Sequence, residues 1–150
     1  MSVSSPKTDD KKIPLASYSV KVRPRYSETD QMGYVYHGRF VEYFEMARTE
    51  MVREAGFSYD KLEKMGVMMP IIDLSLKFNE PAFYDEELTV TVSIFEKPGI
   101  RLRTHYEIRN SEGKLNNTGS VTLCFVDKET RRPVRPPQEF IDGMLKVNKS

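Results

Sequence analysis

The stretch Tyr26–Gly56 reads YSETDQMGYVYHGRFVEYFEMARTEMVREAG, and its second half has the spacing of one amphipathic helix. Apolar residues recur there every three or four positions, which places them on one side of a helix: Phe40, Phe44, Ala47, Met51 and Ala55. Gly56 follows at the position where a glycine commonly ends a helix. The spacing therefore predicts a helix over Gly38–Ala55 that buries one face against the rest of the chain.

On both sides of this helix, apolar residues alternate with polar ones, as they do in β-strands with one buried face. One such run begins at Ser17 and stops near Pro24, a residue typical of a strand edge or end. Four more β-rich runs follow the helix, at Met68–Phe78, Leu88–Glu96, Ile100–Arg109 and Leu115–Val126. Turn sequences separate the last three runs, at Pro98-Gly99 and at Asn110–Gly113. We therefore expect the four strands to pair as an antiparallel meander.

The helix and the strands need each other, because neither an apolar helix stripe nor a half-apolar sheet is stable alone in water. The sequence thus predicts an α+β fold in which the long helix is wrapped by a five-stranded antiparallel sheet. Two shorter helices are expected, at Tyr59–Met65 and, after a basic and proline-rich segment, at Gln138–Val147.

The length and composition are those of one domain. The 150 residues, of which 39% are hydrophobic, are enough for one core and leave no room for a second domain of ordinary size. We assign residues 16–150 to this domain. Residues 1–15 are polar and carry adjacent acidic and basic pairs, so we expect a disordered N-terminal arm.

Several classes of function are disfavoured by composition. The net charge of +1 is far from the basic excess of proteins that bind phosphate backbones, so nucleic acid is not an expected partner. No apolar run approaches the roughly 18 to 20 residues that span a bilayer, so no membrane span is expected. The N-terminus lacks the apolar segment of a signal peptide, which favours a cytoplasmic location. One cysteine, Cys124, and two histidines, His37 and His105, are too few for a usual zinc site, so no metal is expected. Cys124 and His105 are expected to be structural.

The segment Tyr26–Arg48 resembles the hot-dog fold thioesterases of the 4-hydroxybenzoyl-CoA thioesterase family, and more closely the acyl-CoA thioesterase branch associated with the Tol-Pal gene cluster. The matching residues are a Thr-Asp pair, a glycine, a Val-Tyr-His run, an aromatic residue and a Phe-Glu-x-Ala-Arg motif: Thr29, Asp30, Gly33, Val35, Tyr36, His37, Phe40, Phe44, Glu45, Ala47 and Arg48. With the strand pattern the resemblance covers roughly Ser17–Arg132. It implies a hot-dog fold and hydrolysis of an acyl-CoA substrate to a carboxylic acid and coenzyme A, without a metal or organic cofactor.

The residue chemistry of the segment agrees with this resemblance. Thioester hydrolysis needs a carboxylate that attacks the carbonyl or activates water, and donors that stabilise the oxyanion. A loop carboxylate just before a helix and the unpaired amides of the first helical turn supply both. The resemblance implies that Asp30 is the catalytic carboxylate and that the backbone amide of His37 polarises the thioester carbonyl. Whether Asp30 acts as nucleophile or as general base stays open, as does the role of the His37 side chain.

Other positions are predicted to contact the substrate. The matched motif singles out Gly33, Tyr36 and Glu45, and Glu45 is also expected to pair with Arg48 on the helix surface.

Coenzyme A carries phosphate groups, so basic residues are expected near the mouth of the site. Lys97, Arg101 and Arg103 flank a predicted hairpin, and a second basic group follows the last strand: Arg131, Arg132 and Arg135. A solvated basic surface is the alternative for both groups.

Two other functions remain open at this level. An acyl-carrier-protein thioesterase shares the chemistry but docks a protein, and a non-catalytic acyl-ligand binding protein can use the same fold. Asp30 argues against the second, because a pure binder needs no carboxylate there. The resemblance further implies a homodimer or homotetramer with active sites between protomers. The acyl chain cannot be read, because pocket depth depends on tertiary packing.

Overall fold

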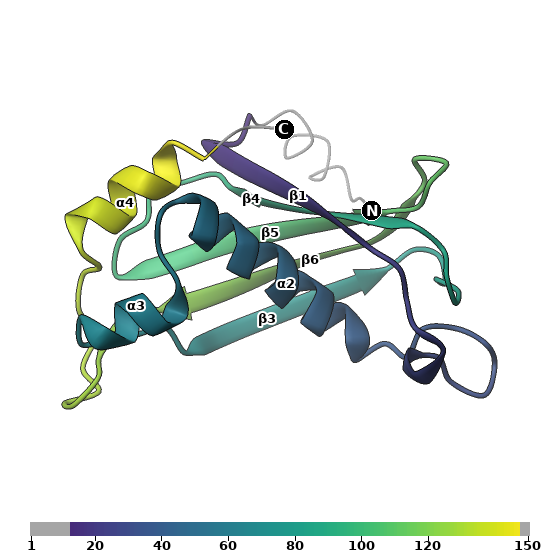
Figure 1. Cartoon of the computed structure of the whole chain (residues 1–150), viewed down its shortest axis with the longest axis horizontal. Helices are drawn as coiled ribbons and strands as arrows, with labels where there is room; N and C mark the ends of the chain where they lie inside the picture. Colours follow the sequence, from purple (N-terminus) through teal and green to yellow (C-terminus); the bar gives the residue numbers. More distant parts are fainter. Residues whose placement is uncertain (1–12, 148–150) are drawn as a thin grey trace, which may run out of the picture.

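The computed structural model describes residues 13–147 of the chain, and Figure 1 shows their arrangement. In chain order the elements are β1 (Ala16–Val22), the short 3₁₀ helix η1 (Tyr26–Glu28), α2 (Arg39–Glu54), α3 (Tyr59–Lys64), β2 (Val67–Met68), β3 (Ile71–Phe78), β4 (Leu88–Ile94), β5 (Arg101–Arg109), β6 (Leu115–Cys124), β7 (Val126–Asp127) and α4 (Gln138–Leu145). The three predicted helices are confirmed as α2, α3 and α4. The expected disordered arm lies outside the described residues as far as residue 12, and Leu15 already donates its N–H to the Ile94 carbonyl at 2.8 Å.

Five strands form one antiparallel sheet in the order β1-β4-β5-β6-β3. The expected meander is confirmed for β4, β5 and β6, which the two tight turns connect. The prediction is wrong for β3, which pairs with β6 and not with β4. The reason is the segment 79–87, which has no tight-turn sequence and carries the chain from β3 across to β4. As a result β3 is an edge strand, and β1 forms the opposite edge, as Pro24 suggested.

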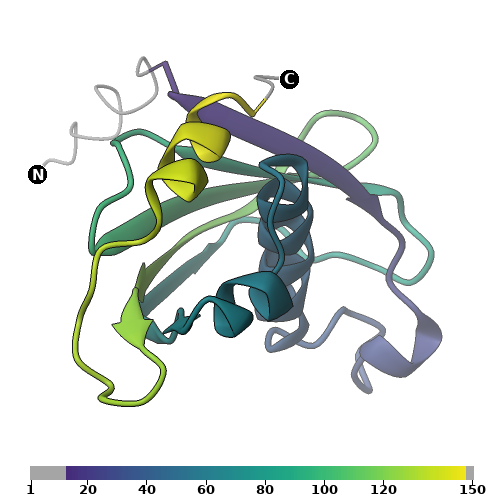
Figure 2. The ribbon, with the colours of Figure 1, turned by 60° about the vertical axis from the view of Figure 1, so that its left-hand side comes forward.

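Helix α2 lies against one face of the sheet, and Figure 2 shows the sheet curving around it. The predicted apolar stripe of α2 is buried from Phe40 to Met51. Phe44 stacks on Tyr106 of β5 with ring centroids 4.3 Å apart. Gly119 of β6 permits this close approach, because a Cβ there would overlap the Phe44 ring and lie 2.8 Å from the Ser75 carbonyl oxygen. The absence of a side chain at one position of the sheet therefore sets how closely the helix packs.

The predicted surface pair of Glu45 and Arg48 is wrong, because Arg48 points into the core. Its side chain is 3% exposed, its Nε donates to the Tyr59 hydroxyl at 2.7 Å, and its Nη1 donates to the Tyr106 hydroxyl at 2.9 Å. Position 48 is one helical turn after Phe44, so it shares the buried side of α2. Glu45 lies on the exposed side.

Neither a membrane-spanning helix nor a cluster of metal ligands is found among residues 13–147. None of their helices is long and apolar enough to cross a membrane. Nor do these residues bring together three or more His, Cys, Asp or Glu side chains that could hold a metal ion.

Candidate active site

Asp30 begins a tight loop between η1 and α2. The Asp30 N–H donates to the Tyr34 carbonyl at 2.7 Å, and the Gly33 N–H donates back to the Asp30 carbonyl at 3.0 Å. The carboxylate takes part as well, since Oδ1 accepts the N–H groups of Met32 and Tyr34 at 2.8 and 3.2 Å. Among residues 13–147 the other oxygen, Oδ2, has no hydrogen-bond or ion-pair partner, and the side chain is exposed. One oxygen of Asp30 thus shapes the loop and the other is available for chemistry.

Gly33 is needed for the shape of this loop. Its φ of +84° is a conformation that other residues rarely adopt, and a Cβ there would meet no atom within 4 Å. Glycine is therefore required at position 33 for its backbone conformation, and not because a larger side chain would clash. The structure gives this conformational role to a residue that the sequence placed among the substrate contacts.

A cavity of about 420 Å³ opens beside the Asp30 loop. It is lined by the loop, the start of α2 and the segment after β3: Asp30, Tyr34, Val35, His37, Phe40, Phe78, Asn79, Glu80, Pro81 and Ala82. The last segment is tied to the loop, because the Val35 N–H donates to the Ala82 carbonyl at 2.8 Å and Tyr34 forms a β-bridge with Phe83. Two carboxylates, those of Asp30 and Glu80, therefore border one mostly apolar and aromatic hollow.

Within the described part of the chain, the backbone leading into α2 carries two unpaired donors, and one of the two residues, His37, lines the cavity. Among residues 13–147 the N–H groups of His37 and Gly38 have no acceptor, whereas the next amide, that of Arg39, donates to the Tyr36 carbonyl at 2.9 Å. The His37 ring packs on the Tyr36 ring, with centroids 4.3 Å apart, and meets the Phe78 ring edge-on at 6.4 Å. The predicted residues Asp30 and His37 thus border one cavity, with Tyr36 packed beside them.

A buried acid lies at the base of the loop. Glu28 is 9% exposed, and its Oε1 accepts the Tyr43 hydroxyl at 2.7 Å and the Arg25 N–H at 2.9 Å. Burial by itself raises the pKa of Glu28, but the hydrogen bonds from Arg25 and Tyr43, together with the positive charges of Arg25 and Arg39, outweigh it and leave the pKa below its ordinary value. Burial, then the hydrogen bond to Glu28, raises the pKa of Tyr43. The tyrosine therefore stays protonated and donates to an ionised carboxylate.

Sequence reasoning missed the segment 78–82, which forms one wall of the cavity. Pro81 after a β-rich run marks the end of a strand, but no local signal connects it with a loop some fifty residues earlier. Phe40 was expected mainly in the core, and it also lines the cavity, where its ring lies 5.8 Å from that of Phe78.

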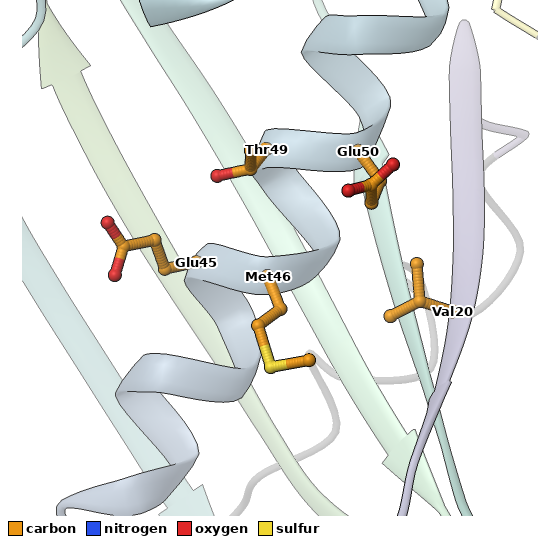
Figure 3. Close-up of a pocket in the computed structure, with 5 residues that line it drawn as sticks. All are labelled: Val20, Glu45, Met46, Thr49 and Glu50. Atoms are coloured by element: carbon orange, nitrogen blue, oxygen red, sulfur yellow. The ribbon is translucent and has the colours of Figure 1, made fainter.

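Glu45 lies outside this cavity. It lines a second, smaller hollow of about 250 Å³ with four other residues, which Figure 3 shows between α2 and β1: Val20, Met46, Thr49 and Glu50. In Figure 3 Met46 and Glu50 lie toward Val20, whereas Glu45 points away from β1. The helical rise of 1.5 Å per residue places Glu45 about 9 Å along the helix axis from Arg39. Within one chain, the structure does not bring Glu45 to Asp30.

The basic residues of the predicted phosphate site are also remote from Asp30. Arg101 and Arg103 lie at the start of β5, and their side chains leave the face of the sheet opposite to α2. Arg101 pairs with Cys124, whereas the cavity borders the other end of the sheet, where Phe78 is the partner of Asn117. Seven residues of strand, at about 3.3 Å each, put the two ends about 23 Å apart. The expectation that Lys97, Arg101 and Arg103 lie at the mouth of the Asp30 site is thus not met within a single chain.

The two residues expected to be structural do not border the cavity. His105 lies on the outer face of β5, with its ring 5.2 Å from that of Phe95, and Cys124 is buried at the end of β6.

Comparisons with known proteins identify relatives over most of the chain. A family model described as the thioesterase-like superfamily matches residues 24–144. The acyl-CoA thioester hydrolase YbgC of Escherichia coli O157:H7 is 32% identical over 120 residues, which are 80% of this chain and 90% of that protein. The crystal structure of a DHNA-CoA thioesterase from Staphylococcus aureus is 35% identical, with a TM-score of 0.76 and 80% of each chain covered. A gentisyl-coenzyme A thioesterase, BH1999, at 16% identity and a TM-score of 0.73, shares the fold.

Proposed function

Since the chain belongs to the thioesterase-like superfamily and has its hot-dog fold, we propose that it hydrolyses an acyl-CoA thioester to a carboxylic acid and free coenzyme A. The observation that supports this most directly is the Asp30 carboxylate, which has one free oxygen beside a cavity that is also lined by His37, whose backbone N–H is unpaired among residues 13–147. The narrower assignment to the Tol-Pal-associated branch and the cytoplasmic location stay predictions.

The proposed chemistry uses Asp30 and the amide of His37. With the thioester carbonyl in the cavity, Asp30 acts on the carbonyl carbon, either directly or by taking a proton from a water molecule that attacks it. The oxyanion that forms accepts the N–H of His37. Collapse of this intermediate breaks the carbon–sulfur bond. In the general-base route the proton taken from water goes to the departing coenzyme A sulfur. In the direct route the coenzyme A thiolate leaves and takes a proton from solvent, and water then hydrolyses the anhydride between Asp30 and the acyl group. Both routes need Asp30 ionised and end in the same products.

Thiol release from a panel of short, long and aromatic acyl-CoA substrates, and from the matching acyl-carrier-protein thioesters, tests this function. We expect release from at least one acyl-CoA. Release from the carrier-protein thioesters alone would favour the second kind of thioesterase. Tight binding of acyl-CoA without thiol release would make the protein a binder and contradict the proposal.

The edge of the sheet supports a homo-oligomer. β3 has a free edge among the described residues, and its side chains are exposed along almost its whole length. Four large apolar side chains of β3 are 44 to 51% exposed: Ile71, Ile72, Leu74 and Phe78. A second copy that pairs with this edge would bury these side chains and satisfy the open backbone groups. Phe78 also lines the Asp30 cavity, so the proposed interface reaches the site.

We expect the protein to have at least twice the chain mass of 17.4 kDa in solution. Ile71→Lys/Leu74→Lys adds two positive charges to the same apolar edge of each copy and would bury them in the proposed interface, so this variant should be a monomer. Met65→Lys/Ile100→Lys is the matched control, because these side chains are equally exposed (46% and 43%) but lie outside β3. Light scattering at micromolar concentration measures the mass. A wild-type monomer would contradict the proposal.

Phosphate recognition by Arg101 and Arg103 now requires a neighbouring copy, since one chain holds them far from its own cavity. If they bind the coenzyme A phosphates, Arg101→Ala/Arg103→Ala should raise KM and leave kcat little changed, because the lost contacts are remote from the reacting carbon. Arg109→Ala/Lys114→Ala removes the same charge from the other end of the β5–β6 hairpin and serves as the control. A KM for Arg101→Ala/Arg103→Ala equal to that of the wild type would show that Arg101 and Arg103 are solvated surface.

A further inference from the structure

A buried hydrogen bond between side chains joins the Asp30 loop to α2, from the Tyr43 hydroxyl to Glu28 Oε1 at 2.7 Å. Glu28 lies two residues before Asp30, and its backbone carbonyl accepts the Tyr36 N–H at 2.9 Å. The β-bridge between Thr29 and Val35 follows directly. Glu28 therefore belongs to the segment that enters the Asp30 loop and is hydrogen-bonded to the segment that leaves it.

The other end of the bond is part of the helix that borders the cavity. Tyr43 is 2% exposed and meets Phe40 edge-on, with ring centroids 5.9 Å apart. Phe40 in turn lines the cavity, and its ring lies against that of Phe78, which also lines it. Since the apolar stripe of α2 is packed on the sheet, the helix is the fixed part and the loop is the part that the bond holds.

The two halves of the proposed site belong to these two segments. Asp30 is on the loop, whereas the free amide of His37 belongs to the backbone that enters α2. The six residues between them, 31–36, are exposed except for Val35. Catalysis depends strongly on such spacing, because a misplacement of about 1 Å can cost about 10²-fold in rate.

We propose that Glu28 and Tyr43 are positioning residues, whose hydrogen bond holds the Asp30 carboxylate at the correct distance from the amides at the start of α2. This inference rests on the hydrolysis proposed above. Neither side chain lines the cavity, so neither is assigned a contact with substrate. Because Glu28 is buried and ionised, loss of the Tyr43 hydroxyl leaves its carboxylate with the Arg25 amide as its remaining donor among the described residues, and the loop then shifts to solvate it.

Four variants test the proposal through the split between kcat and KM. Tyr43→Phe and Glu28→Ala should each lower kcat by about tenfold with little change in KM, as expected for misplaced catalytic groups. Glu28→Gln keeps an oxygen that accepts both donors, so it should retain most of the activity. The double variant Glu28→Ala/Tyr43→Phe should be no slower than either single variant, because the pair acts as a unit.

Tyr59→Phe is the matched control. Like Tyr43→Phe, this change removes a hydroxyl that forms a 2.7 Å hydrogen bond with a buried, charged side chain. The partner here is Arg48 of α2, and the bond lies far from the Asp30 loop. Tyr59→Phe should lower the melting temperature and leave kcat unchanged. A Tyr43→Phe enzyme with the kcat of Tyr59→Phe would overturn the proposal.

Amide hydrogen exchange separates this inference from the proposed function. Exchange at residues 29–36 should be faster in Tyr43→Phe than in the wild type or in Tyr59→Phe. If the wild type releases thiol from no substrate, the proposed function fails, and exchange alone then decides whether the bond holds the loop. Unchanged exchange in Tyr43→Phe overturns the inference whether or not the enzyme is active.

Discussion

Replacing Asp30 with Asn is expected to lower kcat by at least about 10²-fold, because the amide can neither attack the thioester nor accept a proton from water. The fold of the loop should survive. Asn Oδ1 can still accept the N–H groups of Met32 and Tyr34, which are the contacts that the carboxylate makes in the structure. The measurement is thiol release with the best acyl-CoA of the panel, beside the melting temperature of the same preparation.

Asp127 supplies a closely matched control for Asp30. Its Oδ1 accepts two backbone N–H groups, those of Glu129 and Thr130 at 2.9 Å each, in a tight turn that does not border the cavity. Asp127→Asn therefore makes the same chemical change in the same local setting. It should leave kcat near that of the wild type. A folded Asp30→Asn variant as active as Asp127→Asn would remove Asp30 from the mechanism.

Replacing Gly119 with Ala is expected to destabilise the fold by about 2 to 3 kcal/mol, because the core has no space for the added methyl group. That Cβ would overlap the Phe44 ring, and it would lie 2.8 Å from the Ser75 carbonyl oxygen, which belongs to the backbone and cannot rotate away. For a chain of this length the corresponding drop in melting temperature is about 5 to 10 °C.

Gly99→Ala is the control for this substitution. Gly99 lies in the turn between β4 and β5, and a Cβ there would meet no atom within 4 Å. Its melting temperature should stay within about 2 °C of the wild type. Adding Phe44→Leu to Gly119→Ala should cost less than the sum of the two single changes, since the smaller side chain relieves part of the overlap. Equal melting temperatures for the two glycine variants would show that α2 moves away from the sheet at little cost.

Local patterns in the chain predicted a good part of this fold. The three helices lie within two residues of their predicted ends, because apolar spacing and a terminal glycine act over a few neighbouring positions. The β4-β5-β6 meander was predictable for the same reason, since its turns are short and have recognisable sequences. The motif around Asp30 and His37 is equally local, and both residues border one cavity.

Other features depend on which distant segments meet. The place of β3 at the sheet edge, the approach of residues 78–82 to the Asp30 loop and the distance of Arg101 from it all follow from strand order and register, which no nearby residue encodes. The burial of Arg48 could likewise be seen only in the folded molecule, because its two hydroxyl partners, Tyr59 and Tyr106, come from other elements. Spacing along the chain was thus enough to predict where the helices and most strands lie, and to single out the carboxylate that precedes the long helix. The walls of the cavity and the bond between Glu28 and Tyr43 were decided only in the folded molecule, where long-range hydrogen bonding and packing bring separate segments together.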